Sequence, residues 1–143
     1  MNREIKFRGY NYQYEKWFYG SLFIQKYDND LTLSNSRTMI IDDRGYSVMV
    51  DNDTIGQYTN LKDKNGVDIY EGDICKGNEF SDEDDLFIIK YGKYKTNDWK
   101  EKYICNTYQY GWFAEHIKTK DQIHLVTPNG IEVIGNIYEN EVD

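Results

Sequence analysis

Acid–base or metal chemistry in this chain would centre on its two histidines, His116 and His124, and on the carboxylates close to them, Glu115 and Asp121. A histidine near a carboxylate is a common general base or metal ligand. The spacing of these residues matches no metal motif, and no GxSxG or comparable arrangement holds a nucleophile beside a base. We therefore expect ordinary surface histidines, no metal, no cofactor and no enzymatic activity. An enzyme that uses these residues is the less favoured alternative.

A second group of residues that could have a function is the stretch 90–103, in which five lysines and four aromatic residues interleave with two acids. Lysines that neutralise phosphates and rings that stack on bases would make a face for single-stranded nucleic acid. The alternative is a β-hairpin over residues 90–102, with its aromatic residues in the core and its lysines on a solvated edge. The net charge of −8 favours this alternative. The candidate contacts to a protein partner or to nucleic acid are Lys93, Tyr94, Lys95 and Trp99.

The acidic run at residues 82–85 places four carboxylates in consecutive positions. Such a run could attract a divalent cation or imitate the phosphates of DNA. Nothing in the sequence arranges its oxygens around one centre, as a hard cation requires. A solvated loop that favours solubility is the simpler interpretation.

The composition favours strands over helices. The chain has 143 residues, with 14 tyrosines, 6 phenylalanines and 3 tryptophans but a single proline. Aromatic residues suit a pleated, half-buried surface. Cys75 and Cys105 have no CxxC spacing, so we expect both to be reduced. No apolar run approaches the roughly 20 residues that span a bilayer, so we expect a cytoplasmic protein with no membrane contact.

Short apolar or aromatic runs separated by turn residues predict the strands. Alternation of apolar and charged residues at 4–10 predicts an amphipathic first strand. Asn65-Gly66 predicts a type I′ hairpin turn, and a turn at 42–45 joins two of the earlier strands. Helix should be limited to a turn or two near residues 113–118. The remaining predicted strands cover residues 17–24, 38–41, 46–50, 70–74, 86–91, 103–106, 110–115, 122–126 and 131–138.

About ten short strands at this spacing predict an all-β fold with minimal helix. Small barrels would close the sheet edges that invite aggregation, so we expect one or two of them. The entry into the strand at Glu71-Gly72-Asp73-Ile74 favours an SH3-like barrel for the C-terminal part. We place an N-terminal β sub-domain at residues 1–53 and a C-terminal β-barrel sub-domain at residues 54–143. The two could share one core and count as a single domain.

Three motifs resemble the YopX family: Ile5-Lys6-Phe7-Arg8, the block at residues 58–74, and the block at residues 131–140. The resemblance implies a small protein of phages and prophages of Gram-positive bacteria, and it carries no assigned activity or catalytic residue. Asn60 stands where members often have glycine, and asparagine tolerates the same positive φ. Gly66, Gly72 and Gly135 also make structural sense without the resemblance, because each would meet a backbone demand.

Together these observations predict a non-enzymatic accessory protein that binds an unknown host or phage protein in the host cytosol. Self-association into a homo-oligomer is compatible with a tyrosine-rich β surface. Nucleic acid is the alternative partner, bound directly by the stretch 90–102 or imitated by the carboxylates of the acidic run.

Overall fold

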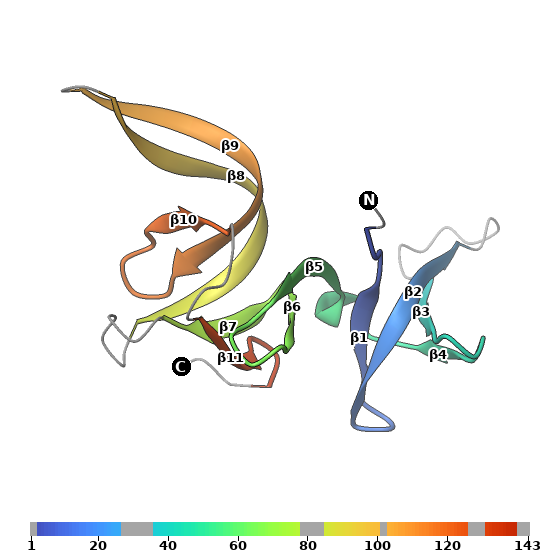
Figure 1. Ribbon diagram of the computed structural model, residues 1–143. Coiled ribbons are helices and arrows are strands. Elements are labelled where there is room, and N and C mark those ends of the chain that lie inside the picture. Colours follow the sequence, from blue (N-terminus) through green and yellow to red (C-terminus); the bar gives the residue numbers. More distant parts are fainter. Residues whose placement is uncertain (1–2, 27–35, 78–84, 101–102, 126–130, 140–143) are drawn as a thin grey trace. The chain divides into compact units, whose positions relative to one another are not determined.

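A computed structural model describes residues 3–26, 36–77, 85–100, 103–125 and 131–139 of the chain, with backbone alone at 36, 96–100 and 103–107. The described residues form eleven strands and one 3-10 helix, η1 (Asn52–Thr54). The expected all-β fold is therefore confirmed (Figure 1). The strands are β1 (Phe7–Asn11), β2 (Lys16–Lys26), β3 (Ser36–Ile41), β4 (Ser47–Met49), β5 (Gly56–Lys62), β6 (Asp68–Tyr70), β7 (Asp73–Lys76), β8 (Leu86–Lys100), β9 (Tyr103–His116), β10 (Gln122–His124) and β11 (Glu132–Asn136).

The chain divides into two compact units, Met1–Asn60 and Leu61–Asp143. This division falls inside β5, whereas the boundary predicted from the sequence lies after residue 53. The strands form two antiparallel sheets with the orders β4-β3-β2-β1-β5-β6 and β10-β9-β8-β7-β11. Each order begins and ends at an edge strand, and the described residues contain no closed barrel. The barrel prediction, including the SH3-like barrel, is not confirmed.

The first unit is a meander of antiparallel hairpins. The predicted turn at residues 42–45 is confirmed, because the Asp42 side chain accepts hydrogen bonds from the amides of Arg44 at 3.0 Å and Tyr46 at 2.9 Å. Gly20 in β2 lies so close to β3 that a Cβ atom would meet the Ile41 carbonyl oxygen at 2.0 Å. Only glycine allows this approach of the two backbones.

The hairpin between β5 and β6 differs from its predicted turn type. A type I′ turn needs positive φ at both central residues. Here Gly66 has a φ of 80°, and Asn65 is not among the residues with positive φ. The amide of Asp63 donates to the Val67 carbonyl at 2.8 Å, which leaves a three-residue loop. Because Asp63 itself binds the amides of Asn65 at 2.8 Å and Val67 at 2.9 Å, the type I geometry followed by a left-handed glycine is favoured.

The core of the second unit is apolar and spans several strands. Its buried members are Ile69, Cys75, Ile89, Ala114 and Leu125. Cys75 is buried within this core, and its reduced state stays a prediction. The Cys105 side chain lies outside the described residues.

Two long strands dominate the second unit, and they correct two predictions. Residues 90–100 do not make a hairpin of their own, because they belong to β8, which pairs with β9 from Phe87↔His116 to Lys100↔Tyr103. Residues 113–116 are the end of β9 and not a helix, and a turn follows at 117–119. Aromatic and β-branched residues favour this extended backbone over a helical one.

The β8–β9 ribbon bends over β10 (Figure 1). Gly92 and Gly111 are directly paired and have φ angles of 147° and 154°, which side chains rarely adopt. Across this pair the rings of Tyr94 and Phe113 stack with centroids 5.1 Å apart. Tyr94 is paired with Gln109, four positions from Phe113, and four residues of straight strand would span about 13 Å. The bend at the two glycines therefore brings these rings together.

Candidate functional site

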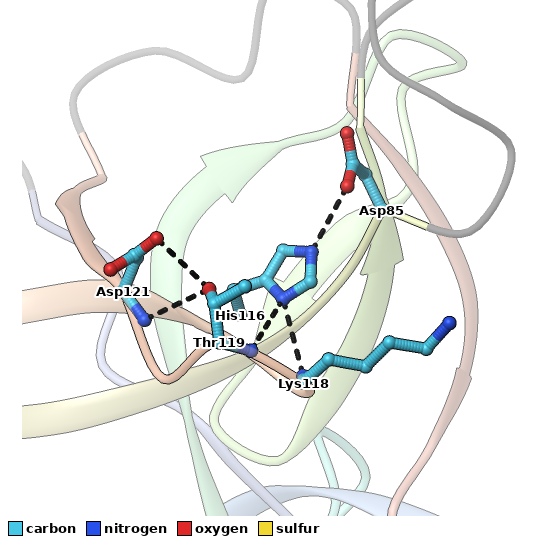
Figure 2. Close-up of polar contacts among 5 residues, drawn as sticks. All are labelled: Asp85, His116, Lys118, Thr119 and Asp121. Atoms are coloured by element: carbon cyan, nitrogen blue, oxygen red, sulfur yellow. Dashed lines mark hydrogen bonds and ion pairs between the residues drawn. The ribbon is translucent and has the colours of Figure 1, made fainter.

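His116 is buried at the end of β9, so the expected surface position is wrong for this histidine, and its ring is held on both sides (Figure 2). Its Nδ1 atom accepts hydrogen bonds from the backbone amides of Lys118 at 3.2 Å and Thr119 at 3.1 Å. Its Nε2 atom lies 3.0 Å from Oδ1 of Asp85. The Phe87 ring packs edge-on against the imidazole, with centroids 5.1 Å apart.

These contacts assign the proton on the His116 ring. Nδ1 faces two N–H donors, so it carries a lone pair, and Nε2 carries the proton that it donates to the Asp85 carboxylate. A general base needs a free lone pair that can reach a substrate. In this geometry the lone pair instead organises the turn after β9.

The rest of that turn is held by its own polar groups. Thr119 Oγ1 donates to the Asp121 carboxylate at 2.9 Å (Figure 2). The His116 amide donates to the Asp121 carbonyl at 2.8 Å. Glu115 forms an ion pair with Lys90 across the ribbon. The two carboxylates proposed beside the histidines therefore have partners that are not histidine side chains.

His124 belongs to a different network, built on β10 and the buried Tyr94. The Tyr94 hydroxyl donates to Gln109 Oε1 at 3.0 Å and also contacts His124 Nδ1. Since a hydroxyl has one proton, His124 Nδ1 is the donor in the second bond. Burial raises the pKa of Tyr94, which keeps its hydroxyl neutral. His116 and His124 share no described hydrogen-bond partner, so the structure does not bring them together as an acid–base pair.

The candidate contacts in β8 lie on two faces of the ribbon. Lys93 and Lys95 are exposed on one face. Tyr94 is 1% exposed on the other, so it cannot contribute to a surface. Trp99 lies in β8, but its side chain is outside the described residues, as are residues 82–84 of the acidic run.

Pairing with β9 places aromatic residues beside the two lysines. Tyr110 lies directly opposite Lys93, and Tyr108 lies directly opposite Lys95. Residues directly opposite in a sheet project from the same face. We call this surface the tyrosine–lysine face, and its described members are Tyr91, Lys93, Lys95, Tyr108, Tyr110 and Trp112.

Contacts within the tyrosine–lysine face hold its side chains in order. The Lys93 ammonium lies 4.5 Å from the centroid of the Tyr108 ring. Tyr91 packs edge-on against Trp112, with centroids 5.0 Å apart. Tyr91, Tyr108 and Tyr110 are nevertheless 61%, 59% and 76% exposed. Sequence reasoning missed Tyr108 and Tyr110 as neighbours of the lysines because only the register of β8 with β9 joins them.

Asp63 in the central motif has a structural role. Its Oδ1 binds the amides of its own turn, and its Oδ2 accepts a hydrogen bond from the Val133 amide of β11 at 3.0 Å. Burial acts to raise the pKa of Asp63, but these three backbone hydrogen bonds and the nearby Lys64 ammonium outweigh it, so the pKa is lowered. Asp63 thus ties the hairpin of β5 and β6 to β11.

Residues 6–142 of the chain match a protein family that is described as YopX protein. The chain belongs to the YopX family. The central and C-terminal motifs of this YopX chain lie inside the matched range, and Asn60 has a positive φ of 67°. No curated protein matches the sequence.

A solved structure with a similar fold is the crystal structure of protein EF1440 from Enterococcus faecalis. It has a TM-score of 0.50 and 21% sequence identity, and the match covers 99% of this YopX chain and 98% of that chain. A likeness at this identity concerns the fold alone. Separately, no helix in the described ranges has the length and apolar character needed to cross a membrane.

Proposed function

We propose that this YopX-family chain is a non-enzymatic phage or prophage accessory protein that binds another protein in the cytosol of its bacterial host. The tyrosine–lysine face is the binding surface. The observation that carries the proposal is the exposure of three tyrosines, Tyr91, Tyr108 and Tyr110, on one side of a two-stranded ribbon.

Exposed aromatic side chains in a cluster are typical of binding sites. Tyrosine supplies a large apolar ring and a hydroxyl, and it is enriched among the residues that dominate binding energy. A two-stranded ribbon is only marginally stable by itself in water. Contact with a partner on this face would bury the rings and stabilise the ribbon.

The geometry of His116 supports a non-enzymatic function. Its Nδ1 lone pair is used by two backbone amides and its Nε2 proton by Asp85, so substrate chemistry there would require these bonds to break. The buried position of the ring opposes such a rearrangement, because amides without partners inside a protein are costly.

Single-stranded nucleic acid is the second candidate partner, favoured by the alternation of Lys93 and Lys95 with exposed rings on one face. Base stacking on tyrosine and neutralisation of phosphates by lysine would then act together. The net charge of −8 opposes the approach of a polyanion.

The test is a pull-down with the tagged full chain from host lysate, with and without nuclease, followed by mass spectrometry. The variant Tyr110→Ala removes the most exposed ring of the face, and Tyr46→Ala is the control because Tyr46 is similarly exposed, at 69%, in the other unit. We expect a stoichiometric protein that survives nuclease, is lost with Tyr110→Ala and is retained with Tyr46→Ala. Capture that Tyr110→Ala leaves intact would contradict the proposed surface, and loss of every partner with nuclease would favour nucleic acid.

A further inference from the structure

We infer that the partner presents an extended acidic segment, with carboxylates at every second residue, to Lys93 and Lys95. This inference rests on the proposed function and names the chemistry of the partner at the same face. It follows from the charge of the face, the exposure of its rings and the spacing of its two lysines.

The charge of the face is opposite to that of the unit that carries it. Leu61–Asp143 contains ten lysines against seventeen acidic residues, so most of the net charge of −8 belongs to this unit. No ion pair joins Lys93 or Lys95 to a carboxylate within the described ranges, whereas Lys90, at a position of opposite parity in β8, is paired with Glu115. The face therefore presents two ammonium groups without a carboxylate partner among the described residues, and opposite charge on a partner would complement them.

The rings beside these ammonium groups lower the solvent exposure that a new ion pair would have. Tyr110 is directly opposite Lys93, and Tyr108 is directly opposite Lys95. The centroid of the Tyr108 ring also lies 4.5 Å from the Lys93 ammonium. Exposed ion pairs contribute little, and partial burial against rings that exclude water makes them stronger. Carboxylates that reach these lysines would be covered by aromatic side chains on one side.

The spacing of the lysines selects an extended segment. Lys93 and Lys95 are two residues apart on one face of β8, which corresponds to roughly 6.6–6.8 Å along the strand. Alternate side chains of an extended peptide repeat with the same spacing. A segment with acidic residues at positions i and i+2 can therefore meet both lysines at once.

The small number of lysines on the tyrosine–lysine face disfavours nucleic acid as the partner. Only two lysines of the described face are available for phosphates, and electrostatic affinity for single strands scales with the number of phosphates neutralised. Two contacts would give weak binding, opposed by the negative charge of the rest of the unit. Bases could stack on the tyrosines as peptide side chains could, so the small number of phosphate contacts is what disfavours nucleic acid.

The experiment measures binding of a fluorescein-labelled peptide of about ten residues, with glutamate at alternate positions, to the full chain by fluorescence anisotropy. Three further probes complete the set: the same peptide with lysine for glutamate, an isomer with all glutamates clustered at one end, and oligo(dT). We expect the alternating glutamate peptide to bind at least about tenfold more tightly than either peptide control, with an affinity that falls as salt rises.

The double variant Lys93→Glu/Lys95→Glu should weaken that binding by about tenfold or more, through like-charge repulsion. Lys118→Glu/Lys120→Glu is the matched control, since it makes the same charge change at two exposed lysines of the same unit. Lys93→Ala/Lys95→Ala keeps the result interpretable if the glutamate variant does not fold.

Equal binding of all peptides, or equal loss with the control variant, would overturn the inference. Tighter binding of oligo(dT) that is lost with the Lys93 and Lys95 variants would replace the acidic segment with nucleic acid. If the acidic peptide fails but a protein captured from lysate still depends on Tyr110, the partner chemistry is wrong and the proposed protein-binding function stands.

Discussion

Asp63 and His116 each use a buried polar side chain to accept hydrogen bonds from backbone amides. Asp63 has three such donors, two in its own turn and one in β11. His116 has two donors in the turn that follows β9. Both residues carry groups that catalysis often uses, and in this protein both groups specify the path of the chain.

Replacing Asp63 with asparagine should destabilise the protein by about 1–3 kcal/mol at neutral pH, because an amide NH₂ group would face a backbone donor. The pKa of Asp63 is lowered in the folded state. Its contribution to stability is therefore complete above the unfolded pKa, near 3.9, and is lost as pH falls through the lower folded value. Urea unfolding at neutral and acidic pH measures both effects.

The pH dependence supplies the control for that substitution. We expect Asp63→Asn and the unchanged protein to approach each other in stability at the acidic end, once the carboxylate is protonated. A difference that stays constant across the whole pH range would show that the charge of Asp63 is not what stabilises the turn.

For His116 we expect the tautomer with its proton on Nε2. The reason is that the Lys118 and Thr119 amides both point at Nδ1. Nitrogen-15 chemical shifts of the ring report the tautomer directly. A proton found on Nδ1 of His116 would remove the structural role assigned to it.

The β8–β9 ribbon has its bend where two glycines, Gly92 and Gly111, are paired. A Cβ atom at either position would meet nothing within 4 Å, so space is not the constraint. The φ angles of 147° and 154° are the constraint, because alanine avoids them. The bend in turn sets Tyr94 on Phe113 and on His124, which leaves the tyrosine–lysine face on the opposite side.

Alanine at Gly92 or Gly111 should cost about 1–3 kcal/mol and reduce the bend. In solution we expect the nuclear Overhauser effects between the Tyr94 and Phe113 rings to be lost and the midpoint of urea unfolding to fall. Gly45→Asn is a suitable control, since Gly45 lies in a turn with open space around it and asparagine tolerates its positive φ. Unchanged ring contacts in both alanine variants would mean that packing, and not the glycines, produces the bend.

At the scale of the whole molecule, each unit has buried residues of its own. Ile40, Val50 and Tyr58 are buried in the first unit, while the Ile69 and Ile89 core belongs to the second. Strand β5 crosses the division between them. A change that damages one core should therefore act first on the unit that contains it.

Gly20→Ala tests this expectation, because its methyl group would overlap the Ile41 carbonyl oxygen. We expect a loss of about 2–4 kcal/mol that appears as faster amide exchange in Met1–Asn60, with smaller changes in Leu61–Asp143. Hydrogen exchange read by mass spectrometry resolves the two ranges. Equal acceleration in both would show that the chain unfolds as a single cooperative unit.

Alternation and turn residues in the sequence correctly predicted an all-β chain, because strand faces and tight turns depend on neighbours a few positions away. The turn held by Asp42 is one such case. Because alternate residues of a strand point to opposite faces, the sequence also indicates that Tyr94 lies on the face opposite to Lys93 and Lys95. Listing all three as one candidate surface overlooked this alternation. The length of β8 could not be predicted, since lysine and asparagine in its outer half disfavour strands and only pairing with β9 holds them extended.

By itself, the sequence determined the strand composition of this protein, the turn at Asp42, the place but not the type of the turn at Gly66, and the presence of two lysines on one side of a strand. Only the tertiary structure decided that Tyr108 and Tyr110 lie opposite those lysines, that His116 holds a turn, and how the described strands are ordered in two sheets. The physical reason is that cross-strand register and closure depend on contacts between residues far apart in the chain, which no local pattern encodes.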